Sequence, residues 1–173
     1  IKKTIPELPE QKRKRFVIEY NLPEYDAGVL TSSKELANYF EKCTSLFSKP
    51  KNISNWIMGD LLRELNKSNQ AISKCPVSPS ALVNLLKLID EDVISGNIAK
   101  SVFEEMYQTG KEPTAIIDEK GLKQITDDKA IDKMVEEVLQ ANLSQVDEYK
   151  RGKEKVLGFL VGQVMKASKG KAN

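Results

Sequence analysis

The chain has 173 residues, of which 40% are hydrophobic and 30% are charged, and its formal net charge is +2. These values are ordinary for a globular protein of one domain or two small ones, and no apolar run approaches the ~20 residues that a membrane span needs. The sequence contains no histidine, which removes the usual general base at neutral pH and the commonest metal ligand. Because the chain begins at Ile1 rather than at a methionine, we expect it to be part of a longer protein.

Hydrophobic spacing predicts helices almost throughout, and the alternating β-branched runs that form strands are nearly missing. Ser32 and Glu35 fit a capping box, Ser78 before Pro79 is typical of a helix start, and Thr126 is expected to cap a later helix. The predicted helices cover residues 11–20, a short segment that ends near 30, 34–44, 53–67, 81–95, 98–109, 114–119, 126–142, 144–151 and 153–169. We therefore predict an all-α fold, with an N-terminal multihelical array over residues 1–120 and a three-helix tail bundle over residues 121–173.

Charge is unevenly distributed along the chain. Residues 90–148 hold 15 acidic and six basic side chains, whereas residues 147–173 hold three acidic and seven basic ones. A polyanion would be attracted to the last segment and repelled by the middle of the chain. The segment Lys12–Arg15 is a second basic cluster, although its four consecutive side chains must point around a helix, so that only about half of them can meet one partner.

The last predicted helix combines lysines with glycines on one face. At 100° per residue, one arc of roughly 80° holds Lys155, Gly158, Gly162, Lys166 and Lys169. The opposite side is expected to face the core and holds Leu157, Leu160, Val164 and Ala167. An interior glycine costs a helix roughly 1 kcal/mol relative to alanine, so two glycines on one line indicate close approach of another backbone. That backbone can be a sugar-phosphate chain or a second protein helix, and the pattern alone leaves both interpretations open.

The residue types that catalysis needs are not arranged for it. The sequence has no GxxxxGK[ST] loop to cradle phosphates, and its acid pairs are adjacent on helices, where neighbouring side chains point about 100° apart. Lone serines have no base to activate them. We therefore predict no catalytic residue and no metal site in this chain, and either a nucleic-acid-binding module or a protein-docking scaffold.

Four stretches, taken together and in order, resemble one family. They are IPELPEQKRKRF, NWIMGDLLRELN, SGNIAKSVFEEMYQTGKEP and KEKVLGFLVGQVMKASKGKAN. The chain resembles the C-terminal half of the B subunit of the aspartyl/glutamyl-tRNA(Asn/Gln) amidotransferases, and its tail also resembles the YqeY-like family. The resemblance implies a tail that contacts the tRNA elbow and a helical domain that supports the acceptor arm. It also implies a further leucine-rich helix beyond the position of Asn173.

The resemblance also implies where the chemistry of the family is located. The enzyme converts Glu-tRNA(Gln) or Asp-tRNA(Asn) to the amidated form, using ammonia from glutamine hydrolysed in its amidase subunit. Its ATP- and Mg-dependent site lies in an N-terminal domain that this sequence lacks, so the fragment is expected to be noncatalytic and to need no cofactor of its own. The implied partners are tRNA(Gln), tRNA(Asn) or both, the amidase subunit and the small subunit of the enzyme, in the cytoplasm and without a membrane.

With this resemblance, the lysine–glycine face becomes the candidate RNA-binding line. Lys153 and Lys171 are candidates at its flanks. Gln163 either reads a base edge or lies in solvent, and Phe159 either stacks on an unpaired base or forms the rim of the core. Trp56 is assigned to the core because of its large apolar area.

Overall fold

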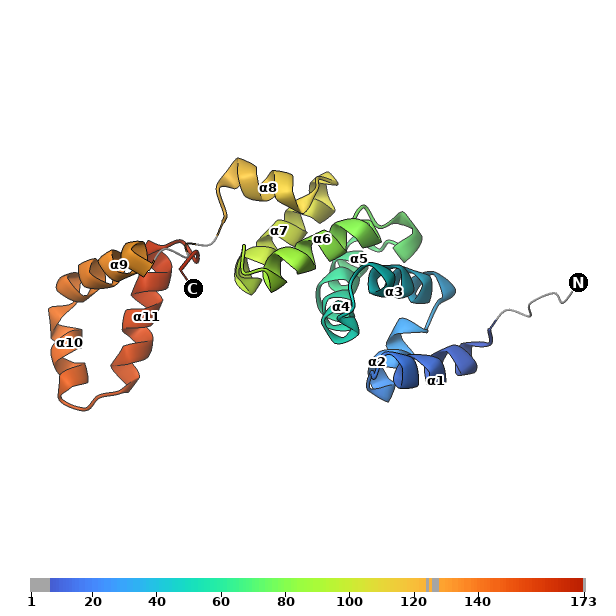
Figure 1. Cartoon of the computed structure of the whole chain (residues 1–173), viewed down its shortest axis with the longest axis horizontal. Coiled ribbons are helices and arrows are strands. Elements are labelled where there is room, and N and C mark those ends of the chain that lie inside the picture. Colours follow the sequence, from blue (N-terminus) through green and yellow to red (C-terminus); the bar gives the residue numbers. More distant parts are fainter. Residues whose placement is uncertain (1–6, 124, 126–127, 173) are drawn as a thin grey trace, which may run out of the picture.

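A computed structural model of the chain describes residues 7–123, 125 and 128–172. Within these ranges the named elements are all helical, which confirms the predicted all-α fold (Figure 1). The α-helices are α1 Pro9–Glu19, α2 Glu24–Leu30, α3 Lys34–Leu46, α4 Pro50–Trp56, α5 Leu62–Ser68, α6 Pro79–Asp90, α7 Gly96–Thr109, α8 Pro113–Lys120, α9 Asp128–Ala141, α10 Leu143–Lys150 and α11 Lys155–Ala167. None of the helices in the described ranges is long and apolar enough to cross a membrane.

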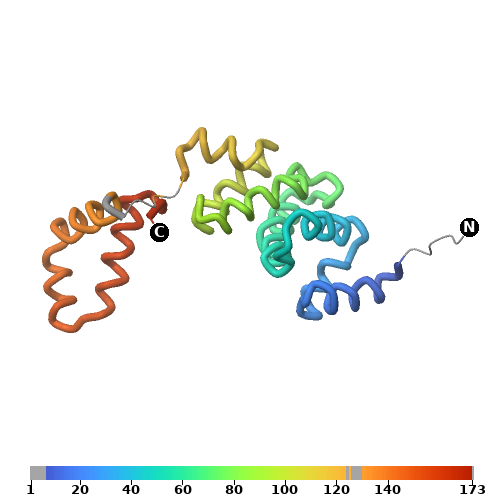
Figure 2. The backbone as a smooth tube through the Cα atoms, in the orientation of Figure 1, coloured from blue at the N-terminus to red at the C-terminus, as the bar shows by residue number. Residues whose placement is uncertain are grey.

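One apolar core joins α1 to α8. Helix α6 lies at its centre, where it contacts α3, α4, α7 and α8 (Figure 2). Near α1 the core is aromatic, because the ring centroid of Phe40 lies 5.1 Å from that of Phe16 and 5.2 Å from that of Tyr20. Phe16 and Phe40 are both fully buried, so this ring cluster ties α1 to α3.

The helix starts follow capping chemistry, with one shift from the sequence prediction. Ser78 caps α6 as predicted, since its Oγ accepts a hydrogen bond from the N–H of Ala81 at 3.1 Å. The predicted cap at Ser32 is wrong by one residue, because Ser33 Oγ accepts from the N–H of Leu36 at 3.1 Å. The N–H of Ser32 donates instead to Val29, which places Ser32 in the turn that ends α2.

The predicted helix over residues 53–67 is interrupted and begins earlier. Pro50 occupies its first turn, where a missing N–H costs nothing. A π turn, Ile57–Leu61, joins α4 to α5, and the N–H of Leu62 donates to the carbonyl of Ile57 five residues back. Four apolar side chains spaced four residues apart along this segment are buried: Ile53, Ile57, Leu61 and Leu65.

Helix α6 ends at Asp90 rather than at Ser95 as predicted. The N–H of Val93 donates to the carbonyl of Leu88 at 2.9 Å, and Asp92 has a left-handed backbone with φ of 54°. The chain thereby turns back, which buries Ile94 and allows Ser95 to cap α7. The apolar pattern of Val93 and Ile94 continues the helical spacing, so no local signal marks this turn.

The tail consists of α9, α10 and α11, which contact one another. Its buried apolar side chains in the described ranges are Val138, Leu160 and Ala172. The predicted boundary near Gly121 coincides with the left-handed C-cap of α8, where φ is 56°, and as a division into domains it stays a prediction. Thr126, the predicted cap of α9, lies outside the described residues.

Candidate nucleic-acid interface

Helix α11 is shorter at both ends than the predicted range of 153–169. It closes in a Schellman motif, in which the N–H of Gly170 donates to the carbonyl of Met165 at 2.8 Å and the N–H of Lys169 to that of Lys166 at 3.1 Å. Lys169 takes the left-handed conformation of this motif, with φ of 54°. Lys169 therefore belongs to the C-terminal turn of α11 and not to the line of the helix itself.

Three lysines of the candidate surface are exposed and carry their charge into solvent. Lys155, Lys166 and Lys169 form no ion pair with any residue that the structure describes. The flanking candidates differ from them. Lys153 pairs with Glu148 at 3.2 Å, and Lys171 is half-buried, with its carbonyl accepting a hydrogen bond from the N–H of Ile125 at 2.8 Å. Among these five candidate lysines, the charge that is both exposed and unpaired within the described ranges is therefore on Lys155, Lys166 and Lys169.

The two glycines of α11 face open space. An added Cβ at Gly158 or Gly162 would meet no described atom within 4 Å beyond its own stretch of helix. Neither glycine therefore packs against another helix within the described ranges. The close approach that their spacing predicts is available to a molecule outside this chain.

The buried side of α11 differs from the predicted core face. Leu160 is buried and Val164 partly buried, as predicted, but Leu157 is 48% exposed and Ala167 is also exposed. The prediction for these two residues is wrong because the main contacts of α11 are with α9 and α10, and two neighbouring helices cover a narrower arc than a complete core would.

Gln163 is partly buried, whereas Phe159 is exposed. Gln163 is half-buried and lines an open groove of about 460 Å³ between α9 and α11, together with Val138 and Lys166. Phe159 is 44% exposed. Lys166 therefore lies where this groove meets the exposed lysine–glycine face.

The open space at the glycines makes a prediction about stability. We expect Gly158→Ala to raise the free energy of unfolding of the tail by about 0.5–1 kcal/mol, because alanine restricts the unfolded chain and meets no neighbour in the folded one. Thermal unfolding followed by circular dichroism measures the change. Gly121→Ala is the opposite control, since φ of 56° at that position strains any side chain. A destabilised Gly158→Ala variant would contradict the open-space description.

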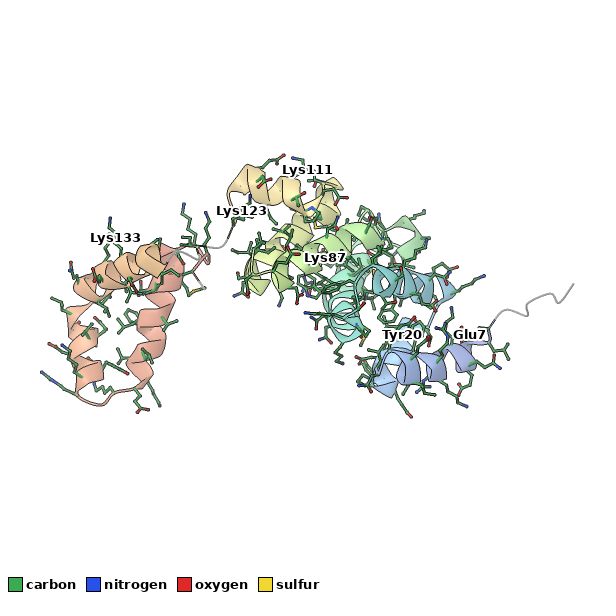
Figure 3. All side chains as sticks on the ribbon, viewed as in Figure 1. Glu7, Tyr20, Lys87, Lys111, Lys123 and Lys133 are labelled. Carbon is green, nitrogen blue, oxygen red and sulfur yellow. The ribbon has the colours of Figure 1, made fainter. Side chains whose placement is uncertain are left out.

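The second basic cluster, Lys12–Arg15, is neutralised by carboxylates. Arg15 binds both oxygens of Glu7 at 2.8 Å, Glu19 at 2.8 Å, and Glu41. Glu7 lies just before α1 (Figure 3). The other three basic residues have their own partners: Lys12 with Glu41, Arg13 with Glu24 and Lys14 with Glu10. A surface whose charges are paired in this way attracts a polyanion weakly, so the structure does not favour it as an RNA site.

Arg15 lowers the pKa of two carboxyl groups. Its hydrogen bonds hold the pKa of Glu7 below the ordinary value. Burial alone would raise the pKa of Glu41, but hydrogen bonds from Arg15 and Lys12 outweigh burial and lower it. A lowered pKa in the folded state stabilises the fold above the ordinary carboxyl pKa of about 4.3, and this stabilisation is lost as the pH falls through the folded value.

The Arg15 network therefore predicts a pH-dependent mutant. At pH 7 we expect Arg15→Gln to lower the free energy of unfolding by about 1 kcal/mol, after solvent screening of these partly exposed pairs. The difference from the unchanged chain should shrink as the pH is lowered from 5 toward 3. Urea unfolding at pH 7 and at pH 3 measures the difference in the free energy of unfolding. Arg151→Gln is the control, because Arg151 has no ion pair in the described ranges. A difference that is constant with pH would contradict the network.

Comparisons with known proteins place the chain among relatives of one kind. The family model described as the GatB domain matches residues 38–173. The chain is 56% identical over its whole length to the B subunit of the aspartyl/glutamyl-tRNA(Asn/Gln) amidotransferase of Caldanaerobacter subterraneus, and 52% identical over its whole length to that of Thermotoga petrophila. It is 57% identical over 98% of its length to the corresponding B subunit of Geobacter sp. strain M21. In each comparison the chain spans 36% of the relative's length.

Proposed function

The chain belongs to the GatB domain family, and from this membership we propose that it is the noncatalytic, tRNA-holding part of the B subunit of an aspartyl/glutamyl-tRNA amidotransferase. In this proposal the tail contacts the elbow of tRNA(Gln) or tRNA(Asn), and the helical array supports the acceptor arm. The chain thereby helps to present the aminoacyl end for conversion of Glu-tRNA(Gln) or Asp-tRNA(Asn) to the amidated form.

The observation that supports this proposal best is the free face of α11. Lys155 and Lys166 are exposed on the helix beside two glycines that no described neighbour covers, and Lys169 follows in the C-terminal turn. Lysines neutralise phosphates, and the bare backbone between them admits a ribose-phosphate chain. Recognition of folded RNA by its shape suits a helical surface that has no exposed aromatic sheet.

We assign the chemistry of amidation to the part of the relatives' length that lies outside this chain. In the described ranges no group of three or more cysteine, aspartate or glutamate residues could hold a metal ion. The sequence also has no phosphate-cradling loop. In this proposal ATP, Mg and the contacts with the amidase subunit and the small subunit belong to the larger protein. Because amidation of aminoacyl-tRNA is a step of translation, the proposal places the protein in the cytoplasm.

The experiment that tests this function is a titration of the chain with unmodified tRNA(Gln) at several salt concentrations, with an unrelated hairpin RNA as control. We expect binding that prefers the folded tRNA and weakens steeply as salt rises. Equal binding to the hairpin would reduce the interaction to general electrostatics. Absence of binding at low salt would contradict an RNA-holding role for this part of the protein.

One observation favours the scaffold as a second candidate function. Leu157 and Val161, one helical turn apart on α11, are 48% and 53% exposed. They adjoin the glycines, and an apolar stripe beside small residues suits the packing of a helix from another protein. Apolar docking is insensitive to salt, whereas phosphate contacts are not, so the same titration series separates the two functions.

A further inference from the structure

The large apolar area of Trp56 predicted a core residue, but the structure places the side chain only partly in the core. Its indole packs against the core on one side, where its ring centroid lies 6.0 Å from that of the buried Phe103. On the other side it lines an open groove of about 350 Å³. The groove lies between the end of α4 and the end of α6, two helices that contact each other. The indole thus has one side packed on Phe103 and another side at the groove.

The groove combines apolar walls with acceptors for hydrogen bonds. Trp56 and Ile89 supply apolar surface, and the exposed Asn52 and Asn55 supply amide groups. Two carboxylates from the end of α6 and the following turn also line it: Asp90 and Asp92. These groups come from two segments that are distant in sequence, and the turn that ends α6 early brings them together.

The charge of the groove is negative. Asp90 is paired with Lys49, which leaves Asp92 without an ion pair among the residues that the structure describes. The left-handed backbone of Asp92, with φ of 54°, holds this carboxylate in the turn beside the groove. A phosphate would be repelled from such a surface, whereas a cation would be attracted both to the carboxylate and to an indole face.

We propose that this groove is a protein-docking site that receives an arginine side chain of a partner protein. A planar guanidinium presents five N–H donors, which match carboxylate and amide oxygens, and it also stacks on aromatic rings. Its aliphatic stem packs on the apolar wall at Ile89. The partner is therefore a protein with an exposed arginine next to apolar residues, and the site is separate from the RNA-facing surface of α11.

Trp56 is the only tryptophan of the chain, so a change in indole fluorescence of the folded chain can be assigned to this one side chain at the groove. The probe is an acetylated and amidated five-residue peptide with a central arginine between two leucines. The matched probe carries citrulline, which has the same shape without the charge. We expect a saturable change in Trp56 emission with the arginine peptide, and an affinity at least about fivefold weaker with the citrulline peptide.

Two matched variants locate the effect. Asp92→Asn should weaken binding of the arginine peptide about threefold or more. Glu91→Gln removes the same charge from the adjacent exposed residue, which does not line the groove, and should leave the affinity unchanged. Circular dichroism establishes that both variants fold.

Three outcomes would overturn the proposal. The first is no saturable response to the arginine peptide, and the second is an equal response to the citrulline peptide. The third is an equal effect of Asp92→Asn and Glu91→Gln. If tRNA changed the Trp56 emission and Asp92→Asn strengthened that response, the groove would instead belong to an RNA surface.

Discussion

A chain in which Lys155, Lys166 and Lys169 are all replaced by glutamate is expected to lose at least about 100-fold in tRNA affinity at low salt. Each of the three side chains is exposed and none is paired within the described ranges, so each is available to a phosphate. Their replacement removes up to three phosphate contacts and adds three repulsive charges. The slope of log affinity against log salt should become shallower by about 0.7–0.9 for each contact that is lost.

The measurement is a titration of labelled tRNA at several salt concentrations. The matched control replaces three other exposed lysines with glutamate, so that the net charge changes equally: Lys34, Lys42 and Lys74. We expect the control to bind within a few-fold of the unchanged chain. If the two triple variants lost affinity equally, the effect would be one of net charge and the α11 surface would not be the site.

Replacement of Phe40 by alanine is expected to lower the free energy of unfolding by about 3–5 kcal/mol. The side chain is fully buried, and its ring contacts those of Phe16 and Tyr20 at centroid distances of 5.1 and 5.2 Å. Alanine leaves a cavity between α1 and α3 that the surrounding rings fill only in part. Urea unfolding followed by Trp56 fluorescence measures the loss.

Phe159→Ala is the matched control for this change. The same chemical substitution at a side chain that is 44% exposed should cost about 1 kcal/mol or less. A cost near that of Phe40→Ala would show that Phe159 belongs to a core. A small cost accompanied by weaker tRNA binding would support a stacking role for this ring.

Local patterns in the sequence predicted most of the helices well. Ser78 with Pro79 identified the start of α6, and Gly110 and Gly121 marked the ends of α7 and α8, where the structure has left-handed residues. Capping and left-handed closure depend on residues within one turn of each other. These signals can therefore be read from the sequence without any information about tertiary contacts.

Features that depend on distant contacts were not predictable. The end of α6 at Asp90 is followed by a turn that buries Ile94, and nothing local distinguishes that residue from one more turn of helix. The buried side of α11 was also misjudged at Leu157, because the helical wheel assumes that an apolar arc is covered and does not say by what. The pairing of Arg15 with Glu41 joins residues 26 positions apart and was equally invisible.

The candidate RNA surface also contains one part that the sequence predicted and one part that it did not. Periodicity correctly grouped Lys155, Gly158, Gly162 and Lys166 on an exposed face, because all four lie within one helix. It placed Lys169 on that helix as well, although the chain has by then turned into the Schellman motif. The contribution of these residues to RNA binding stays a prediction.

The π turn between α4 and α5 has a consequence for how this segment tolerates change in length. On a regular α-helix, side chains four residues apart drift around the axis by about 40° per step, so the spacing from Ile53 to Leu65 would turn about 120° away from the core. A π turn takes about one more residue per turn and reverses the drift, which is why all four side chains of this series stay buried.

The segment from α4 to α5 thus contains one residue more than an unbroken helix that follows the same path. The exposed Gly59, which has no described atom within 4 Å of an added Cβ, lies inside that turn. Relatives that lacked this residue could follow the same path with an ordinary helix, so Gly59 is where a single-residue gap between homologous sequences would do the least harm.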